Sequence, residues 1–119
     1  MQDHYLWILT TALAFIQVAY GNYMTIFGYS NYSIIPHIVI ALLMLIISLI
    51  AMPSVKGQGR RIAIGNVVLI VLNIILGGFI YTFYNPYIVF LHFILGLGIL
   101  SNFIILIAII RYSKHGRAI

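Results

Sequence analysis

Residues 34–52 read IIPHIVIALLMLIISLIAM, a run without Asp, Glu, Lys or Arg. A stretch of about 20 apolar residues is long enough to cross a hydrocarbon layer of about 30 Å as a helix. Three more stretches of similar length and composition occur, at about 6–27, 62–83 and 87–110. The sequence therefore predicts an all-α fold, a polytopic membrane four-helix bundle, in one domain that covers residues 1–119.

The composition of the whole chain agrees with this prediction. The chain is 119 residues long, 64% hydrophobic and only 6% charged, and its mean hydropathy is +1.16. Soluble domains carry about 25% charged residues, so a soluble domain is excluded. The formal net charge is +5. Six basic residues without a soluble domain fit membrane topology better than nucleic-acid binding, and we expect no nucleic-acid partner.

Two residue classes are almost missing. The chain has no cysteine, and its one acidic residue is Asp3, outside the predicted spans. Without thiols it can form no disulfide, hold no thiolate-bound iron–sulfur cluster and attach no haem covalently. Without a carboxylate in the membrane it has no group for a proton relay, for paired acid–base catalysis or for a hard cation. Histidine is therefore the strongest metal ligand left inside the predicted spans.

Short connections, at 28–33, 53–61 and 84–86, join the predicted helices. Helices joined so tightly lie antiparallel beside each other, which gives an up-down-up-down bundle. All the basic residues fall on one predicted side of the membrane: Lys56, Arg60, Arg61, Arg111, Lys114 and Arg117. By the positive-inside rule this side is cytoplasmic. We therefore expect a multi-pass protein of the cell membrane with both termini in the cytoplasm.

The two halves of the chain resemble each other. With an offset of 55, residues 36–42 (PHIVIAL) lie over 91–97 (LHFILGL), and with an offset of 56, residues 21–24 lie over 77–80. Each half holds two spans, so both halves would enter the membrane in the same direction. We expect two tandem two-helix repeats, related by a pseudo-twofold axis along the membrane normal.

Two of the four histidines, His37 and His92, occupy matching positions near the outer ends of the second and fourth spans, whereas His4 and His115 lie in the tails. The second and fourth spans face each other diagonally in such a bundle, so the two imidazoles can share a ligand. Two nitrogens do not complete a zinc site, which needs four donors. Haem brings four equatorial nitrogens and needs only axial ligands. The alternative role for both histidines is structural hydrogen bonding.

A flat macrocycle needs small residues between the helices. Gly96 and Ala41 each follow one of these histidines by four residues, about one helical turn along the same face. Gly77 and Gly78 lie on the third span. Close helix–helix packing is the other role of such residues, and the two roles are compatible.

Together, the segments QVAYGN at 17–22, PHIVIALL at 36–43, LGGF at 76–79 and LHF at 91–93 resemble one four-helix half of haem A synthase. That family carries a histidine at the outer end of the second and fourth helix of each half, which implies His37 and His92 as an axial pair. In the catalytic half a glutamate stands three residues before the first histidine, and here that position is Ile34. The chain therefore resembles the half that keeps a haem b as cofactor.

We expect a haem b-binding, bis-histidine membrane protein that transfers electrons or serves as a haem-bearing subunit of a respiratory terminal oxidase complex. Its partners would be membrane lipids and other membrane subunits, or copies of itself. Haem propionates need donors on the outer side, where Tyr23, Tyr29, Asn31 and Tyr32 are available. The alternatives are a half-length haem A synthase that acts as an oligomer and a haem-free structural membrane subunit.

Overall fold

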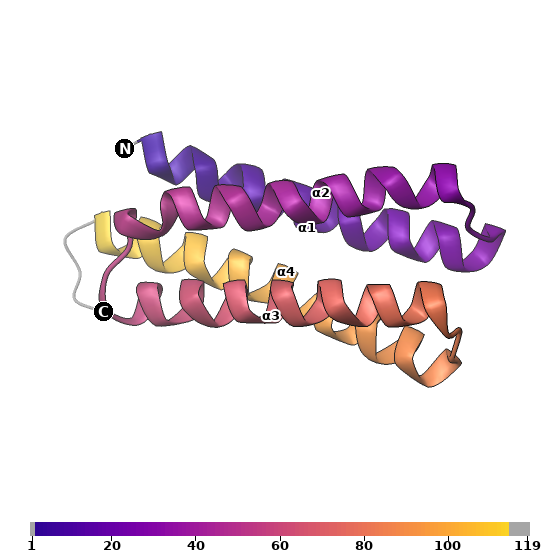
Figure 1. Cartoon of the computed structure of the whole chain (residues 1–119). Coiled ribbons are helices and arrows are strands. Elements are labelled where there is room, and N and C mark those ends of the chain that lie inside the picture. The colour runs from indigo at the N-terminus through magenta and orange to yellow at the C-terminus, as the bar shows by residue number, and fades with distance from the viewer. Residues whose placement is uncertain (1, 115–119) are drawn as a thin grey trace.

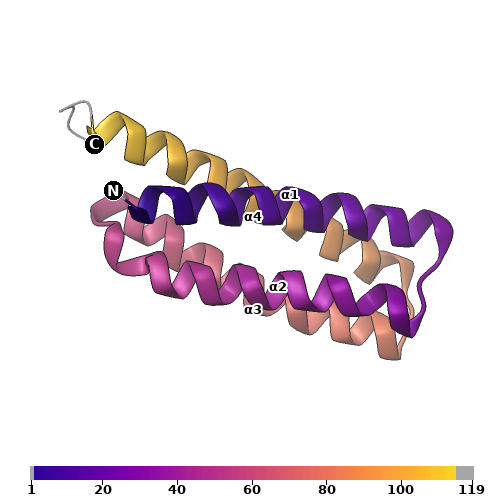
Figure 2. The same ribbon diagram turned by 90° about the horizontal axis from the view of Figure 1, so that it is seen from above.

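Four antiparallel helices form the protein in a computed structural model that describes residues 2–114 (Figure 1, Figure 2). They are α1 (Gln2–Phe27), α2 (Asn31–Ala51), α3 (Gly57–Thr82) and α4 (Pro86–Lys114), and a short 3-10 helix, η1 (Met52–Ser54), follows α2. Consecutive helices pack together and α1 packs against α4, so α2 and α4 lie on one diagonal of the bundle. The all-α prediction is confirmed. His115 and Arg117 lie outside the described residues.

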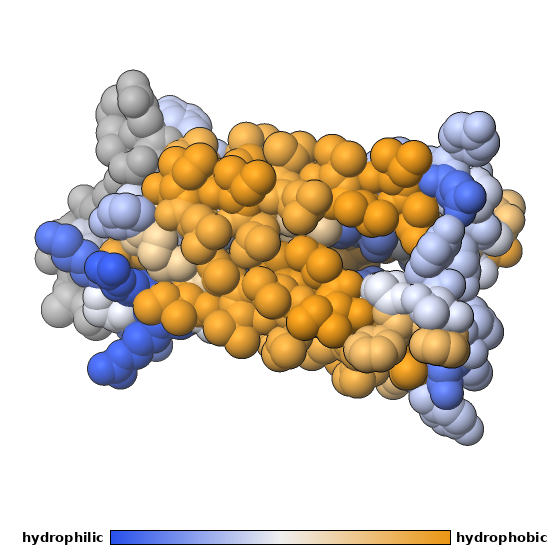
Figure 3. Space-filling view, viewed as in Figure 1, coloured by the Kyte–Doolittle hydropathy of each residue, from blue (hydrophilic) through white to orange (hydrophobic). Residues whose placement is uncertain are grey.

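Three helices are long and apolar enough to cross a membrane, over Asn31–Ser54, Gly57–Thr82 and Pro86–Ser113. Figure 3 shows the broad apolar band of the bundle, with hydrophilic residues gathered at both ends. α1 matches α3 in length, at 26 residues, but it is not among these three helices, and it contains Gln17, Asn22 and several Tyr and Thr residues. Three helices thus indicate a membrane protein, whereas the sequence predicts four spans. Two of the polar side chains of α1, Gln17 and Tyr20, donate hydrogen bonds to backbone carbonyls of α2.

α2 begins at Asn31, earlier than the predicted span, because Ser30 caps it. The Ser30 hydroxyl accepts a hydrogen bond from the Ser33 N–H at 3.3 Å, and the Ser33 hydroxyl accepts one from the Ser30 N–H at 2.7 Å. These reciprocal bonds form a capping box. Pro36 consequently lies inside α2 and not in its first turn. Gly28 follows α1 with a φ of 85°, the left-handed conformation that ends many helices.

The two ends of the bundle differ in their side chains. We call one end the basic end, because it carries Lys56, Arg60, Arg61 and Arg111. The other end, with the loops after α1 and α3, is the aromatic end. The most buried apolar side chains lie mainly in the basic half, and they include Trp7, Ala51, Ala63, Phe103 and Leu106.

Polar bonds add to the packing of the basic half. The indole of Trp7 donates to the Ser54 hydroxyl at 2.9 Å, and the Asn66 amide donates to the carbonyl of Ile99 at 3.1 Å. Buried polar groups need such partners because water is excluded from the bundle. The helices are therefore fixed to one another in the basic half, and the aromatic half is free to hold a cavity.

Candidate functional site

A cavity of about 630 Å³ lies between the four helices in the aromatic half of the bundle. Cofactor and small-molecule sites have volumes of about 300–1,000 Å³. Six of the seven predicted site residues line this cavity: His37, His92, Ala41, Gly96, Gly77 and Gly78. The described lining includes no Asp, Glu, Lys or Arg. The cavity therefore suits a largely apolar ligand of cofactor size.

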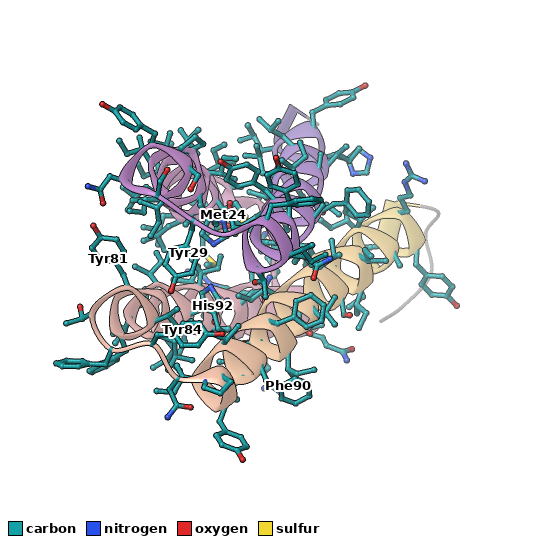
Figure 4. The ribbon with its side chains drawn as sticks, turned by 90° about the vertical axis from the view of Figure 1, so that its right-hand side faces the viewer. Met24, Tyr29, Tyr81, Tyr84, Phe90 and His92 are labelled. Atoms are coloured by element: carbon teal, nitrogen blue, oxygen red, sulfur yellow. The ribbon has the colours of Figure 1, made fainter. Side chains whose placement is uncertain are left out.

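His37 on α2 and His92 on α4 face each other across this cavity. Their ring centroids are 6.1 Å apart, and the ring planes are inclined by 61°. Both side chains are partly buried. Figure 4 looks from the aromatic end and shows His92 between the α1–α2 pair and the α3–α4 pair. The two histidines that the sequence singles out are thus neighbours in the centre of the bundle.

Each histidine rests against a glycine of the preceding helix. A Cβ added to Gly21 would lie 3.1 Å from Cε1 of His37, and one added to Gly77 would lie 3.4 Å from Cε1 of His92. Carbon atoms in favourable contact are about 3.5–4.0 Å apart. Because the two glycines have no side chain, each leaves space for an imidazole. At Gly21 even a methyl group would lie too close to the ring of His37.

Two amide side chains lie one turn before these glycines and line the same cavity. Gln17 precedes Gly21 by four residues, and Asn73 precedes Gly77 by four. The Gln17 side chain donates to the backbone carbonyl of His37 at 2.6 Å, which ties α1 to α2 beside the imidazole. Neither amide is among the predicted site residues. The offset of 56 that aligns the glycines also aligns Gln17 with Asn73, and this signal could have placed them at the site.

Several buried polar atoms in the cavity wall have no hydrogen-bond partner. They are Nδ1 of His37, Nδ1 of His92, Oε1 of Gln17 and Oδ1 of Asn73. Most buried polar atoms in proteins are paired, so an unpaired group calls for a specific explanation. Four such atoms around one cavity mark it as a place for a ligand or ordered water, and not as a packing defect.

The aromatic end of the cavity is lined by neutral polar side chains. Tyr29 from the loop after α1 and Tyr84 from the loop after α3 line it, and Figure 4 shows them on either side of His92. The Tyr81 hydroxyl on α3 donates to the side-chain oxygen of Asn31 on α2. These groups can donate hydrogen bonds to the polar edge of a ligand, although none of them carries a positive charge.

Tyr23, the seventh predicted site residue, lies outside the cavity lining. Its ring is half-exposed and packs against Tyr20 and Phe27 of the same helix. An α-helix turns by about 100° per residue, so a residue two positions after Gly21 points to the opposite face. Tyr32 is also turned outward, with 88% of its surface exposed. Of the four donors expected for propionates, only Tyr29 and Asn31 line the cavity.

The chemistry open to this site follows from its ligands. No group of three or more His, Cys, Asp or Glu occurs within residues 2–114 that could hold a metal ion. Two imidazoles suit a metal that brings its other ligands with it, as haem iron does. Ile34 lies three residues before His37 and lines the cavity, so the side chain at this position is apolar.

Comparison of the chain with protein-family models, with curated proteins and with solved structures found no match.

Proposed function

We propose that this chain is a haem b-binding integral membrane protein with His37 and His92 as the two axial ligands. The observation that carries the proposal is the 6.1 Å separation of the two ring centroids inside the cavity. A metal–imidazole bond is about 2 Å long, and the centre of an imidazole ring lies about 1.1 Å from its nitrogens. Two axial imidazoles on one metal therefore have centroids about 6 Å apart, which agrees with the observed separation.

The residues around the pair fit this cofactor in two further respects. Gly21 and Gly77 leave space for the imidazoles. The small residues Gly96 and Ala41 line the cavity one helical turn after His92 and His37. At the aromatic end, Tyr29, Asn31 and Tyr84 offer hydrogen-bond donors for a carboxylate edge. We propose that these neutral donors hold the propionates.

A haem with both axial positions filled supplies one-electron chemistry and has no open position for oxygen. The chain would then exclude water, fix the two imidazoles and carry an electron within the membrane. A chain of this size would act with other membrane subunits, as in a respiratory terminal oxidase complex, or with copies of itself. We further propose that its two halves are tandem repeats about a pseudo-twofold axis, and that its basic end faces the cytoplasm of a cell membrane.

An optical spectrum of the protein, purified from cells supplied with haem, tests the proposal. We expect sharp haem b bands at one haem per chain, lost in His37→Ala and in His92→Ala. His4→Ala is the matched control, since His4 lies outside the cavity lining, and it should keep the bands. Absence of haem from the wild-type protein would overturn the proposal and favour a haem-free structural subunit. Conversion of haem O to haem A by the purified chain would favour the half-length haem A synthase.

A further inference from the structure

Among the neighbouring α-helices around the cavity, α2 and α3 pack least closely. Five residues there line the cavity and are also exposed on the outer surface of the bundle: Ile35, Ile38, Leu42, Gly78 and Tyr81. We call this part of the wall the slot. Figure 3, which faces α2 and α3, shows a hollow between them near the aromatic end. One layer of side chains therefore separates the histidine pair from the surroundings of the bundle.

The opposite side of the bundle, between α1 and α4, is closed. A Cβ added to Gly96 on α4 would lie 3.4 Å from the Val18 side chain on α1. Ala14 on α1 and Ile99 on α4 line the cavity and are almost completely buried. The side between α1 and α4 is therefore packed more closely than the side between α2 and α3, although the proposed repeat would make the two sides equivalent.

The slot is lined mostly by apolar side chains and is polar at the aromatic end. Ile35, Ile38 and Leu42 are 54%, 49% and 45% exposed and lie on a helix apolar enough to cross a membrane. Gly78 contributes no side chain, and a Cβ added there would meet no atom within 4 Å. At the aromatic end the hydrogen bond from Tyr81 to Asn31 bridges the two helices. This arrangement matches a flat amphiphile whose apolar part lies in the membrane and whose polar edge stays near the interface.

We propose that haem reaches the histidine pair from the membrane, sideways through the slot between α2 and α3, and that the Tyr81–Asn31 hydrogen bond must open to admit it. This inference rests on the proposed function. The alternative route runs along the bundle axis from the aromatic end, past Tyr29 and Tyr84. An apolar macrocycle dissolved in the bilayer would have to leave the hydrocarbon layer to use that route, which costs free energy in proportion to the apolar area exposed.

The test blocks the slot without touching the histidines. Gly78→Leu places a side chain in the open space of the slot, and Gly65→Leu is the matched control. Gly65 is also an exposed residue of α3 with no atom near its added Cβ, but it lies outside the cavity lining. Haem-free protein in phosphatidylcholine vesicles is mixed with haem b in vesicles of the same lipid. The growth of the haem–protein absorption band gives the loading rate, and transfer to an excess of a soluble haem-binding protein gives the release rate.

We expect Gly78→Leu to slow both loading and release of haem by about tenfold or more, as a blocked gate does. Gly65→Leu should behave as wild type. Equal loading rates for Gly78→Leu and Gly65→Leu would overturn the proposed route. Slower loading combined with faster release would also overturn the proposed route, because Gly78 would then contribute to the stability of bound haem and not to its entry.

A second variant keeps the test independent of the folding of Gly78→Leu. Tyr81→Phe removes the hydroxyl that bridges the slot, and Tyr87→Phe removes a hydroxyl at the same end from a residue that is 84% exposed and outside the lining. We expect Tyr81→Phe to load haem a few-fold faster than Tyr87→Phe, and equal rates would count against the route. Failure of the wild-type protein to bind haem would overturn the proposed function itself, whereas equal rates in haem-binding variants overturn only the route.

Discussion

The contact between Gly21 and His37 makes the substitution Gly21→Ala a sensitive probe of the site. The added methyl would lie 3.1 Å from Cε1 of the imidazole. Carbon atoms in contact lie about 3.5–4.0 Å apart, so the ring would have to move by about 0.4–0.9 Å. Functional sites hold their groups within about 0.5 Å of the working geometry. The expected displacement therefore reaches the tolerance of an axial ligand.

The corresponding change on the other helix should have a smaller effect. A Cβ at Gly77 would lie 3.4 Å from Cε1 of His92, which is already close to ordinary van der Waals contact, so the ring needs to move by only about 0.1 Å. Loss of support for a metal ligand lowers affinity by about 10–100-fold. We expect Gly21→Ala to weaken haem binding by about tenfold, at the lower end of that range, and Gly77→Ala to weaken it less.

Neither change should unfold the protein. Alanine is favoured over glycine inside a helix by about 1 kcal/mol, which offsets strain at the contact. The assay is a haem titration of haem-free protein in detergent, followed by the optical spectrum, with a thermal melt of the haem-free form. Gly98→Ala is the control, because a Cβ there meets no atom within 4 Å and Gly98 is outside the lining. Equal haem affinities for Gly21→Ala and Gly98→Ala would refute the argument that the absence of a side chain at Gly21 fixes the position of the His37 imidazole.

Three further predictions concern the rest of the bundle. Trp7→Phe breaks the 2.9 Å bond to Ser54 and should lower the free energy of unfolding by about 1 kcal/mol, measured by a thermal melt in detergent. Adding Ser54→Ala to Trp7→Phe should lower the free energy of unfolding no further. Gln17→Leu removes the donor to the His37 carbonyl; haem affinity should fall about tenfold while the helix content measured by circular dichroism stays unchanged, and wild-type affinity would show that this bond does not position the imidazole. Asn66→Leu removes the buried bond to the Ile99 carbonyl and should cost about 0.6–2 kcal/mol, read from the same melts, without changing the haem spectrum.

The sequence predicts the helices well and their ends less well. Runs such as 34–52 mark apolar helices without ambiguity, but α2 begins at Asn31 because two serines cap it outside the apolar run. Hydropathy detects the part of a helix that suits lipid, and not the polar turns that continue it. The same limit affects α1, because Gln17 and Tyr20 lower its hydropathy although both side chains bond to α2.

The site was predictable as far as helical periodicity reaches. Ala41 and Gly96 follow the histidines by one turn and line the cavity as expected. Tyr23 points away, and the same periodicity, applied from Gly21, would have shown it. The difference between the open side and the closed side of the bundle could not have been derived, because it depends on how closely Val18 approaches Gly96. Such distances are set by the packing of all four helices and not by any one of them.

α1 has a low hydropathy and still packs in the bundle, because two of its polar side chains bond to α2. Gln17 donates to the carbonyl of His37 at 2.6 Å, and the Tyr20 hydroxyl donates to the carbonyl of Ser33 at 2.7 Å. In the hydrocarbon layer an unpaired polar group costs several kcal/mol. These two polar side chains of α1 therefore have partners because α1 lies against α2. The bond from Gln17 also ties the backbone of His37 to α1 beside the cavity. The same pair of hydrogen bonds thus contributes both to the pairing of α1 with α2 and to the position of the imidazole.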